Sequence, residues 1–258
     1  MPDHRVAAVE DNLLDFFGSC ADLPVLTREP WDDVAAYCSP VPFPLFNGIT
    51  GARFAPGQET DRARAVLERY VARGLPALWW TTPSTSSPAL ERVLVEHGWT
   101  REDVPGMHLP VAALVDRPPL PGVGLTTVDL TRSPEPFVST MLAGFGMPPE
   151  LAGDFGAVFG HLDPDRCVNV VATVDGEPAA TATGWRQAGT IGVYNVATVT
   201  DHRGRGLGSA ITAAVVAIGR ERGDTDAVLH ASEMGRPVYE RMGFAAVCTV
   251  PQFVWLPS

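Results

Sequence analysis

The second half of the chain alternates between runs with the two-residue period of strands and runs with the spacing of helices. In residues 167–174 and 178–186, apolar side chains alternate with small or polar ones, as expected for strands that bury one face. Asp175-Gly176 separates these two runs, and this dipeptide favours the type I′ turn of a hairpin. The pattern therefore predicts an antiparallel strand pair in the middle of this half.

The flanking segments extend the hairpin into a mixed α/β arrangement with the order β-α-α-β-β-β-α-β-α-β. The predicted segments are a strand at 123–129, helices at 134–145 and 149–159, the two hairpin strands, a strand at 190–199, a helix around 211–218, a strand at 227–231, a helix that ends before Gly243, and a final hairpin strand at 246–256. This order predicts a sheet with helices packed on it.

A proline-rich bridge, residues 117–122 with the sequence Arg-Pro-Pro-Leu-Pro-Gly, precedes this half. Proline fixes φ and glycine relaxes it, which is typical of a linker. We therefore place a domain boundary after Arg117, which gives domains 1–117 and 118–258. A chain of 258 residues is long enough for two small domains.

Composition narrows the classes of partner. The formal net charge is −11, and all 19 basic side chains are arginine. An acidic chain binds nucleic acid and anionic membranes poorly and attracts cationic amines. The longest uncharged apolar segment, residues 206–219, has 14 residues, too few to span a bilayer. We expect neither nucleic acid nor a membrane as partner, and no secretory signal, because four acids fall within the first 15 residues.

The four cysteines are Cys20, Cys38, Cys167 and Cys248, and they form no C-x-x-C pair. This spacing argues against zinc and against a disulfide framework. We expect no metal, and buried thiols in a reducing cytoplasm. The lysine-free, arginine- and alanine-rich composition indicates a GC-rich bacterial genome.

A glycine-dense segment, residues 203–209, joins the strand at 190–199 to the following helix. Glycines let the backbone approach a ligand, and the unpaired N–H groups of a helix start attract phosphate. A dinucleotide-binding loop requires a third glycine or alanine where Ser209 or Ile211 stands, and a Walker A loop requires a lysine, which this chain lacks. Neither of these two phosphate-binding loops therefore fits the segment. A tight turn without a ligand is the alternative for this segment taken alone.

The remaining pattern is Arg/Gln-x-x-Gly-x-Gly/Ala, matched by Arg203, Gly206 and Gly208. About thirty residues downstream, Tyr239-Glu240-Arg241-Met242-Gly243-Phe244 matches a Tyr-Glu-x-x-Gly-Phe signature. In these two motifs, the chain resembles the GNAT superfamily of N-acetyltransferases over roughly residues 120–258. The resemblance implies the GNAT fold and use of acetyl-coenzyme A.

The resemblance also implies a cofactor site. The pantetheine arm is expected to pair with the backbone of the strand end, and the pyrophosphate with N–H groups of the glycine turn. The residues expected to bind the cofactor are Val196, Ala197, Thr198, Val199, Arg203, Gly204, Arg205, Gly206, Leu207, Gly208, Ser209 and Ser232. For the Arg205 side chain we favour a solvated surface position, and Ser232 is equally consistent with a helix N-cap.

Tyr239 matches the tyrosine that protonates the coenzyme A thiolate in this family, although a core aromatic is the alternative. The two motifs specify no base, and the strand at 190–199 contains no acid. His230 is one candidate base, with a structural histidine or a chain of waters as alternatives. Asn195, Phe145 and Phe46 are the residues expected to face the substrate.

The first half repeats the latter part of this plan, with a helix at 61–73, a strand at 77–81 and a helix at 89–97. When Gly98-Trp99 is aligned with Gly243-Phe244, Leu94 stands where the second half has Tyr239. Residues 54–59 replace the glycine turn. We therefore predict a degenerate GNAT-like lobe that neither binds the cofactor nor catalyses.

Together these observations predict a cytoplasmic bacterial N-acetyltransferase. It would move an acetyl group from acetyl-coenzyme A to a primary amine of a small molecule, by direct attack in a ternary complex. A monomer or a homodimer is compatible with the sequence. The alternative is a non-catalytic acyl-coenzyme A sensor or a partner-binding protein.

Overall fold

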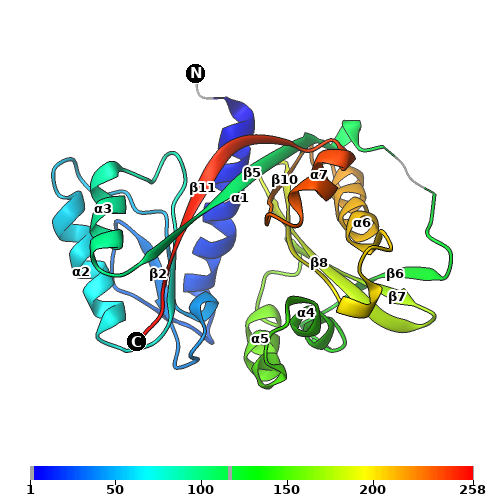
Figure 1. Ribbon diagram of the computed structural model, residues 1–258, viewed down its shortest axis with the longest axis horizontal. Helices are drawn as coiled ribbons and strands as arrows, with labels where there is room; N and C mark the ends of the chain where they lie inside the picture. Colours follow the sequence, from blue (N-terminus) through cyan, green and yellow to red (C-terminus); the bar gives the residue numbers. More distant parts are fainter. Residues whose placement is uncertain (1–2, 116–117, 258) are drawn as a thin grey trace. The chain divides into compact units, whose positions relative to one another are not determined.

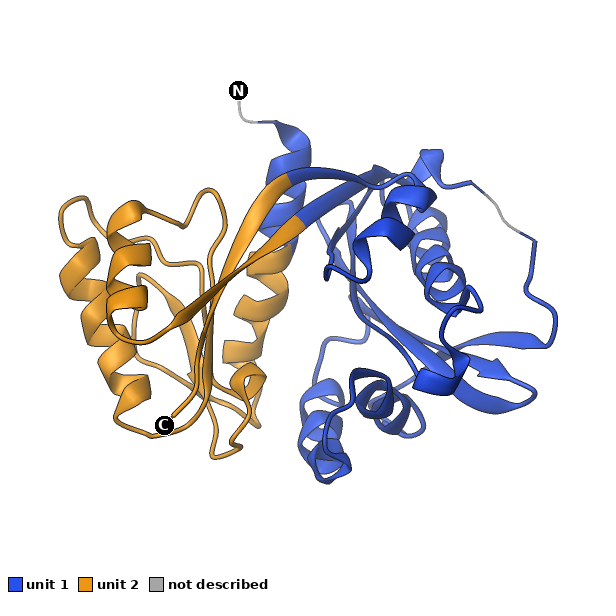
Figure 2. Ribbon diagram, in the orientation of Figure 1, with its two compact units in different colours: residues 1–12, 106–247 blue, residues 13–105, 248–258 orange. Residues whose placement is uncertain are grey.

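The computed structural model describes residues 3–115 and 118–257. The chain forms two compact units (Figure 2): unit 1 contains residues 1–12 and 106–247, and unit 2 contains residues 13–105 and 248–258. The units differ from the two sequence halves, because residues 106–115 lie in unit 1 and the last eleven residues lie in unit 2. Arg117 of the predicted linker lies outside the described residues, and the boundary between two related domains stays a prediction.

Unit 1 is built around a mixed sheet with the strand order β5-β10-β9-β8-β7-β6 (Figure 1). Its elements after β5 follow the predicted order of strands and helices, and β9 and β10 are its parallel pair. The elements are α1 (His4–Ser19, to residue 12), β5 (Thr100–Pro110, from residue 106), β6 (Val123–Val128), α4 (Phe137–Phe145), α5 (Ala152–Phe159), β7 (Cys167–Val174), β8 (Glu177–Gln187), β9 (Thr190–Thr198), α6 (Leu207–Glu221), β10 (Asp226–His230), α7 (Arg236–Met242) and the start of β11 (Ala245–Trp255). The mixed α/β fold class is confirmed.

The central hairpin forms where the sequence predicts it. Asp175 and Gly176 both have positive φ, 53° and 92°, as a type I′ turn requires. Strands β7 and β8 pair antiparallel from Cys167↔Trp185 to Val174↔Glu177. The turn residues therefore set the register of this pair.

Helix α6 packs on one face of the unit 1 sheet. Leu109 of β5 and Leu229 of β10 point to this face and join Ile211 and Val215 of α6 in one buried apolar cluster. The alternate residues of these strands point to the other face. Here Asn12 of α1, fully buried, donates to the Trp185 carbonyl at 3.1 Å. The part of α1 up to Asn12 thus packs on unit 1.

Unit 2 contains a smaller sheet with the order β1-β2-β3-β4-β11. Its elements are the rest of α1, β1 (Thr27–Arg28), β2 (Ala35–Cys38), β3 (Gly48–Thr50), α2 (Glu59–Val71), β4 (Ala77–Trp80), α3 (Pro88–Glu96), the start of β5 and the end of β11. Trp79, Trp99 and Tyr70 are almost fully buried in its apolar core. The elements α2, β4 and α3 lie where the sequence predicts them. No helix among residues 3–115 and 118–257 is long and apolar enough to cross a membrane.

The last strand, β11, was expected to belong to a final hairpin, but β11 and β10 pair with other strands. In unit 2, β11 pairs antiparallel with β4, for example Gln252↔Trp80. In unit 1, β10 pairs antiparallel with β5, for example His230↔Gly106. The reason is that β5 and β11 each begin in one unit and end in the other.

The ends of α3 and α7 have the same hydrogen-bonding pattern. The Trp99 N–H donates to the Leu94 carbonyl at 3.0 Å, and the Phe244 N–H donates to the Tyr239 carbonyl at 3.1 Å. This pattern matches the sequence alignment that placed Leu94 at the position of Tyr239. The glycines of the two turns, with φ of 82° and 99°, are Gly98 and Gly243.

Candidate active site

The parallel strands β9 and β10 separate partway along their length. Their ladder runs from Thr190↔Asp226 to Val193↔Leu229 and then stops. Immediately beyond it, Asn195 has a φ of 51°, and the register between β8 and β9 shifts, which marks a β-bulge. Within the described part of the chain, the last residues of β9 therefore have a partner strand only on the β8 side.

Three predicted pantetheine-binding residues, Val196, Ala197 and Thr198, form this last part of β9, and Val199 follows directly. A Cβ added at Gly144 of α4 would lie 2.8 Å from the Ala197 Cβ. Helix α4 thus lies directly against the strand end. A glycine inside a helical pattern often marks such a close approach, which was the one sequence signal for Gly144.

The glycine turn that follows has the geometry of an anion site. Gly204 and Gly206 have φ of 75° and 84°, and Gly206 is the N-cap of α6. No backbone N–H from Gly204 to Ser209 donates to a protein acceptor in the described hydrogen bonds, and the first turn of α6, which starts at Leu207 and includes Gly208, contains no acid. These N–H groups and the helix dipole favour a bound anion.

The arginines of the turn have different environments. The Arg203 guanidinium donates to the Gly144 carbonyl at 2.7 Å and to the Thr198 carbonyl at 3.2 Å. It thus ties the turn to α4 and to the end of β9. Arg205 is exposed and contacts the ring nitrogen of His202 at 2.9 Å, in agreement with a surface position for its side chain.

An apolar groove of about 420 Å³ follows α6 from this turn. Its walls include Gly206 and Ser209 at the helix start and Ala213 one turn later. Leu120 lies on the facing segment, and its Cδ1 would be 3.6 Å from a Cβ at Gly206. The predicted pyrophosphate turn therefore opens beside apolar surface.

Tyr239 of α7 is 9% exposed, and its ring packs edge to face on Phe244 with centroids 6.1 Å apart. Burial raises the pKa of Tyr239 to about 12, and the Thr212 hydroxyl acts in the opposite direction. The phenol is therefore protonated at neutral pH and can donate a proton.

Ser232 precedes α7, and its hydroxyl oxygen accepts a hydrogen bond from the Gly235 N–H at 3.1 Å. The N-cap of α7 is Gly235, which has no side-chain capping bond, so Ser232 is not the N-cap of this helix. The Ser232 hydrogen can still be donated to a ligand.

His230 ends β10, and its ring lies 6.1 Å from the ring of Tyr194 of β9. Burial lowers the pKa of His230 to about 4. The imidazole is therefore neutral at pH 7 and is a weaker base than an exposed histidine.

The predicted substrate residues lie in different surroundings. The Asn195 amide donates to the Thr183 hydroxyl at 3.2 Å, which holds this side chain against β8. Phe145 is the last residue of α4 and is 45% exposed. Phe46 belongs to unit 2, where it is buried and packs edge to face on Phe43.

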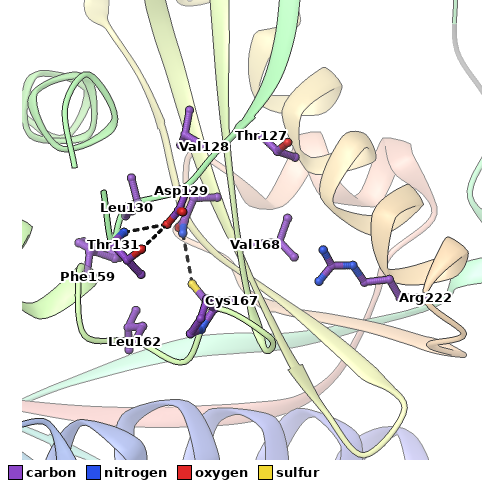
Figure 3. Close-up of a pocket in the computed structure, with 12 residues that line it drawn as sticks. Thr127, Val128, Asp129, Leu130, Thr131, Phe159, Leu162, Cys167, Val168 and Arg222 are labelled. Atoms are coloured by element: carbon purple, nitrogen blue, oxygen red, sulfur yellow. Dashed lines mark hydrogen bonds between the residues drawn. The ribbon is translucent and has the colours of Figure 1, made fainter. Parts of the chain in front are cut away.

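A second hollow in unit 1, of about 350 Å³, lies near the start of β7 and contains none of the predicted site residues (Figure 3). Asn169 donates to the Cys167 sulfur at 3.3 Å on its wall, and Thr131 donates to Asp129 at 2.6 Å. Burial raises the pKa of Cys167 to about 12, so its thiol is unreactive at neutral pH.

The comparison with solved structures places the whole chain among proteins of one fold. A GCN5-related N-acetyltransferase from Kribbella flavida is 21% identical with a TM-score of 0.70, covering 96% of this chain and 95% of that one. A putative GNAT acetyltransferase from Novosphingobium aromaticivorans is 20% identical with a TM-score of 0.59, covering 99% and 100%. A tandem GNAT protein from the clavulanic acid biosynthesis pathway is 15% identical with a TM-score of 0.58, covering 100% and 96%. The predicted GNAT fold is confirmed.

A comparison with curated proteins finds no match. The family model described as the acetyltransferase (GNAT) family matches residues 139–244. These residues include the glycine turn and Tyr239, the two motifs on which the sequence resemblance rests. Residues 139–244 therefore form a domain of the GNAT acetyltransferase family.

Proposed function

We propose that this protein is an N-acetyltransferase that moves an acetyl group from acetyl-coenzyme A to a primary amine of a small molecule. The observation that carries this proposal is the open edge of β9 next to the anion site at the start of α6. An extended thioester cofactor with a pyrophosphate needs both features in this order. The protein would act in the bacterial cytoplasm as a monomer or a homodimer.

The two parts of the cofactor would meet different parts of the site. The N–H groups from Gly204 to Ser209 would hold the pyrophosphate. The backbone from Val196 to Val199 would pair with the amide groups of the pantetheine arm, which places the thioester near the β-bulge. One N–H of this strand end would then donate to the thioester carbonyl and stabilise the charge that develops there.

The acyl transfer itself would proceed by direct attack within a ternary complex. The neutral amine forms a bond to the acetyl carbon, and the carbon–sulfur bond breaks. The leaving thiolate takes a proton from Tyr239, whose raised pKa keeps it protonated until that step. The amine nitrogen loses its extra proton to the solvent side of the site.

The second proton leaves the amine nitrogen and needs an acceptor. Strand β9 carries no acid, and the pKa of about 4 makes His230 a weak base. We therefore favour transfer through water, with His230 as the second choice. The net negative charge of the protein would raise the concentration of cationic amines near the protein surface.

The missing acid on β9 also favours a second candidate function, a sensor that binds acyl-coenzyme A without turnover. A screen of small primary amines with acetyl-coenzyme A and a thiol reagent separates the two candidates. An enzyme releases free coenzyme A in proportion to the acceptor, and this release slows strongly when Tyr239 is replaced by Phe. Binding of acetyl-coenzyme A without thiol release from any amine would favour the sensor.

A further inference from the structure

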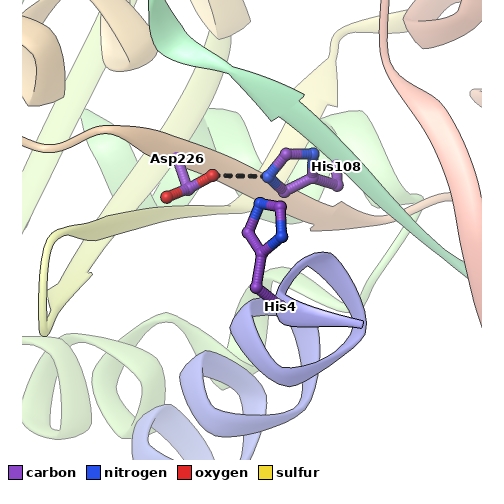
Figure 4. Close-up of side chains that lie close together, drawn as sticks. All are labelled: His4, His108 and Asp226. Carbon is purple, nitrogen blue, oxygen red and sulfur yellow. Dashed lines mark hydrogen bonds and ion pairs between the residues drawn. The ribbon is translucent and has the colours of Figure 1, made fainter. Parts of the chain in front are cut away.

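A cluster of three side chains in unit 1, separate from the acyl-transfer site, has the composition of a metal site (Figure 4). The cluster contains His4 of α1, His108 of β5 and Asp226 of β10. One ligand atom from each residue lies within 4.8 Å of the other two. We propose that these three residues bind a divalent transition metal ion of the zinc type.

The strand register brings two of the three ligands together. His108 stands opposite Val228, and Asp226 stands opposite Pro110, so His108 and Asp226 are diagonal neighbours on the same face of the sheet. The His108 Nε2 lies 2.6 Å from the Asp226 Oδ1. Met107 and Leu109, the neighbours of His108, point to the opposite face and into the apolar core.

Helix α1 supplies the third ligand from its first residue. The His4 ring lies edge to face on the His108 ring with centroids 5.8 Å apart. The buried Asn12, two turns further along α1, fixes this helix on the same face of the sheet. His4 therefore approaches the His108–Asp226 pair from the side of α1, which lies below the pair in the view of Figure 4.

The three side chains would need only small movements to hold a zinc ion. Ligand atoms of tetrahedral zinc, bound at about 2.0–2.2 Å, are about 3.3 Å apart. The 2.6 Å distance between His108 Nε2 and Asp226 Oδ1 would have to open slightly, and the His4 ring would have to turn toward this pair. The side chain of His4 is 77% exposed, with its Nδ1 3.8 Å from the Asp3 Oδ1, and would make this turn, whereas His108 is only 3% exposed and already in place.

The surroundings suit zinc better than the alkaline-earth ions. Two imidazoles and one carboxylate match zinc and its neighbours, whereas magnesium and calcium prefer oxygen ligands alone. The second Asp226 oxygen accepts a hydrogen bond from the Thr225 hydroxyl at 2.7 Å, an outer contact of the kind that orients a metal-binding carboxylate. Water would complete the fourth position beside the exposed His4.

A bound ion would hold the first turn of α1 to β5 and β10. The sequence predicted no metal, but that argument rested on cysteine spacing and did not address these residues. Their positions in the chain, 4, 108 and 226, follow no spacing motif, and only the fold brings them together.

The test uses the full-length chain without a histidine tag, stripped with a chelator and titrated with zinc chloride by calorimetry. We expect one zinc ion per chain, with affinity at least about 10-fold lower in the variants His4→Ala and Asp226→Asn. His161→Ala, which removes an exposed histidine elsewhere in unit 1, is the matched control and should leave the affinity unchanged.

Two further readouts keep the test independent of activity. Cobalt in place of zinc should give visible absorption bands in the wild-type chain and lose them in His4→Ala. Zinc should also raise the melting temperature of the wild-type chain more than that of His4→Ala. The absence of zinc binding, or equal affinity in wild type and His4→Ala, would overturn the proposal, and the His108–Asp226 contact would then be an ordinary hydrogen bond.

Discussion

Unit 1 and unit 2 both contain a parallel strand pair joined by a helix, but the two helices begin in different ways. In unit 1, α6 follows Gly204 and Gly206, and its first turn contains no acid. In unit 2, α2 follows Pro56, which has no N–H, and its first turn contains Glu59 and Asp61. Two carboxylates at a helix start occupy the positive end of the dipole and repel an anion.

The next helix of each unit, α7 in unit 1 and α3 in unit 2, differs from the other at one position that matters for the chemistry. Tyr239 of α7 and Leu94 of α3 accept the same helix-end hydrogen bond through their carbonyls, but only the tyrosine carries a proton donor. The backbone pattern is thus present in both units, whereas the chemical groups are present in one. This difference teaches that the fold of a GNAT-like unit and its chemistry depend on separate sets of residues.

The largest effect on cofactor binding is expected when valine replaces Gly206 in the turn of unit 1, compared with valine at Gly57 in unit 2. Gly206 and Gly57 have φ of 84° and 83°, and a valine at either position costs about 1–2 kcal/mol of backbone strain. Gly206→Val should also block the approach of the pyrophosphate. Loss of two or three charge-assisted hydrogen bonds would weaken acetyl-coenzyme A binding by about 10³-fold or more.

Calorimetry measures this prediction, and Gly57→Val is its matched control. Open space surrounds Gly57, so its replacement should lower stability without changing acetyl-coenzyme A affinity. Equal losses of affinity in both variants would show that the turn in unit 1 has no special role.

The next effect concerns the proton donor. Tyr239→Phe should lower turnover by about 10²- to 10³-fold and leave acetyl-coenzyme A affinity nearly unchanged, because an acid acts mainly in the transition state. The control is Tyr70→Phe in unit 2, where the hydroxyl donates to the carbonyls of Tyr37 and Gly48. That variant should lose about 1 kcal/mol of stability and keep its turnover. Wild-type turnover in Tyr239→Phe would leave Tyr239 as a packing residue.

A smaller effect follows from the buried histidine of unit 1. The pKa of His230 is about 4 in the folded protein and 6.5 for an unperturbed histidine. Between these values the unfolded chain binds more protons, so the free energy of unfolding should fall as pH drops from about 6.5 to 4, by at most about 3 kcal/mol. This contribution is fully present above pH 6.5.

Denaturant unfolding at several pH values measures this dependence, and His230→Gln should flatten it. His97→Gln in unit 2, with a half-exposed ring, provides the comparison. An unchanged pH dependence in His230→Gln would show that the histidine titrates normally in the folded protein.

The smallest effects should be similar in the two units, because they concern packing. A Cβ at Gly192 of β9 would lie 1.9 Å from the Asn12 Oδ1, and a Cβ at Gly48 of β3 would lie 2.3 Å from the Tyr37 hydroxyl. Both neighbours are buried and hydrogen-bonded and cannot easily move. Each alanine variant should lose about 1–3 kcal/mol in denaturant unfolding, and Gly153→Ala, in open space, should lose none. A neutral Gly192→Ala would contradict the tight contact between α1 and β9.

Local residue patterns predict the strands and helices of unit 1 better than those of unit 2. Strand β7 occurs at the predicted residues, because its alternation is regular and Asp175-Gly176 fixes its turn. Strand β5 escaped prediction because its exposed start is charged and Pro105-Gly106 interrupts it. Helix α1 was not predicted either, although Val9, Leu13 and Phe16 are buried at helical spacing along it.

The candidate site also contains residues that the sequence identifies and residues that only the fold brings together. The glycine turn and Tyr239 lie in contiguous motifs and could be found from the sequence. The Gly144 carbonyl that holds Arg203, and Asn12 beneath β9, come from distant segments and could not. Pairing partners such as β4 for β11 are likewise set by the fold, because no local pattern specifies them.

The central claim is that one of the two units binds the cofactor, and the stoichiometry of acetyl-coenzyme A binding tests it most directly. Calorimetric titration of the full-length chain should give one molecule of acetyl-coenzyme A per chain, with an affinity about 10³-fold lower or weaker still in Gly206→Val. Two molecules per chain, or one molecule that still binds Gly206→Val with unchanged affinity, would contradict the account and assign a cofactor site to unit 2.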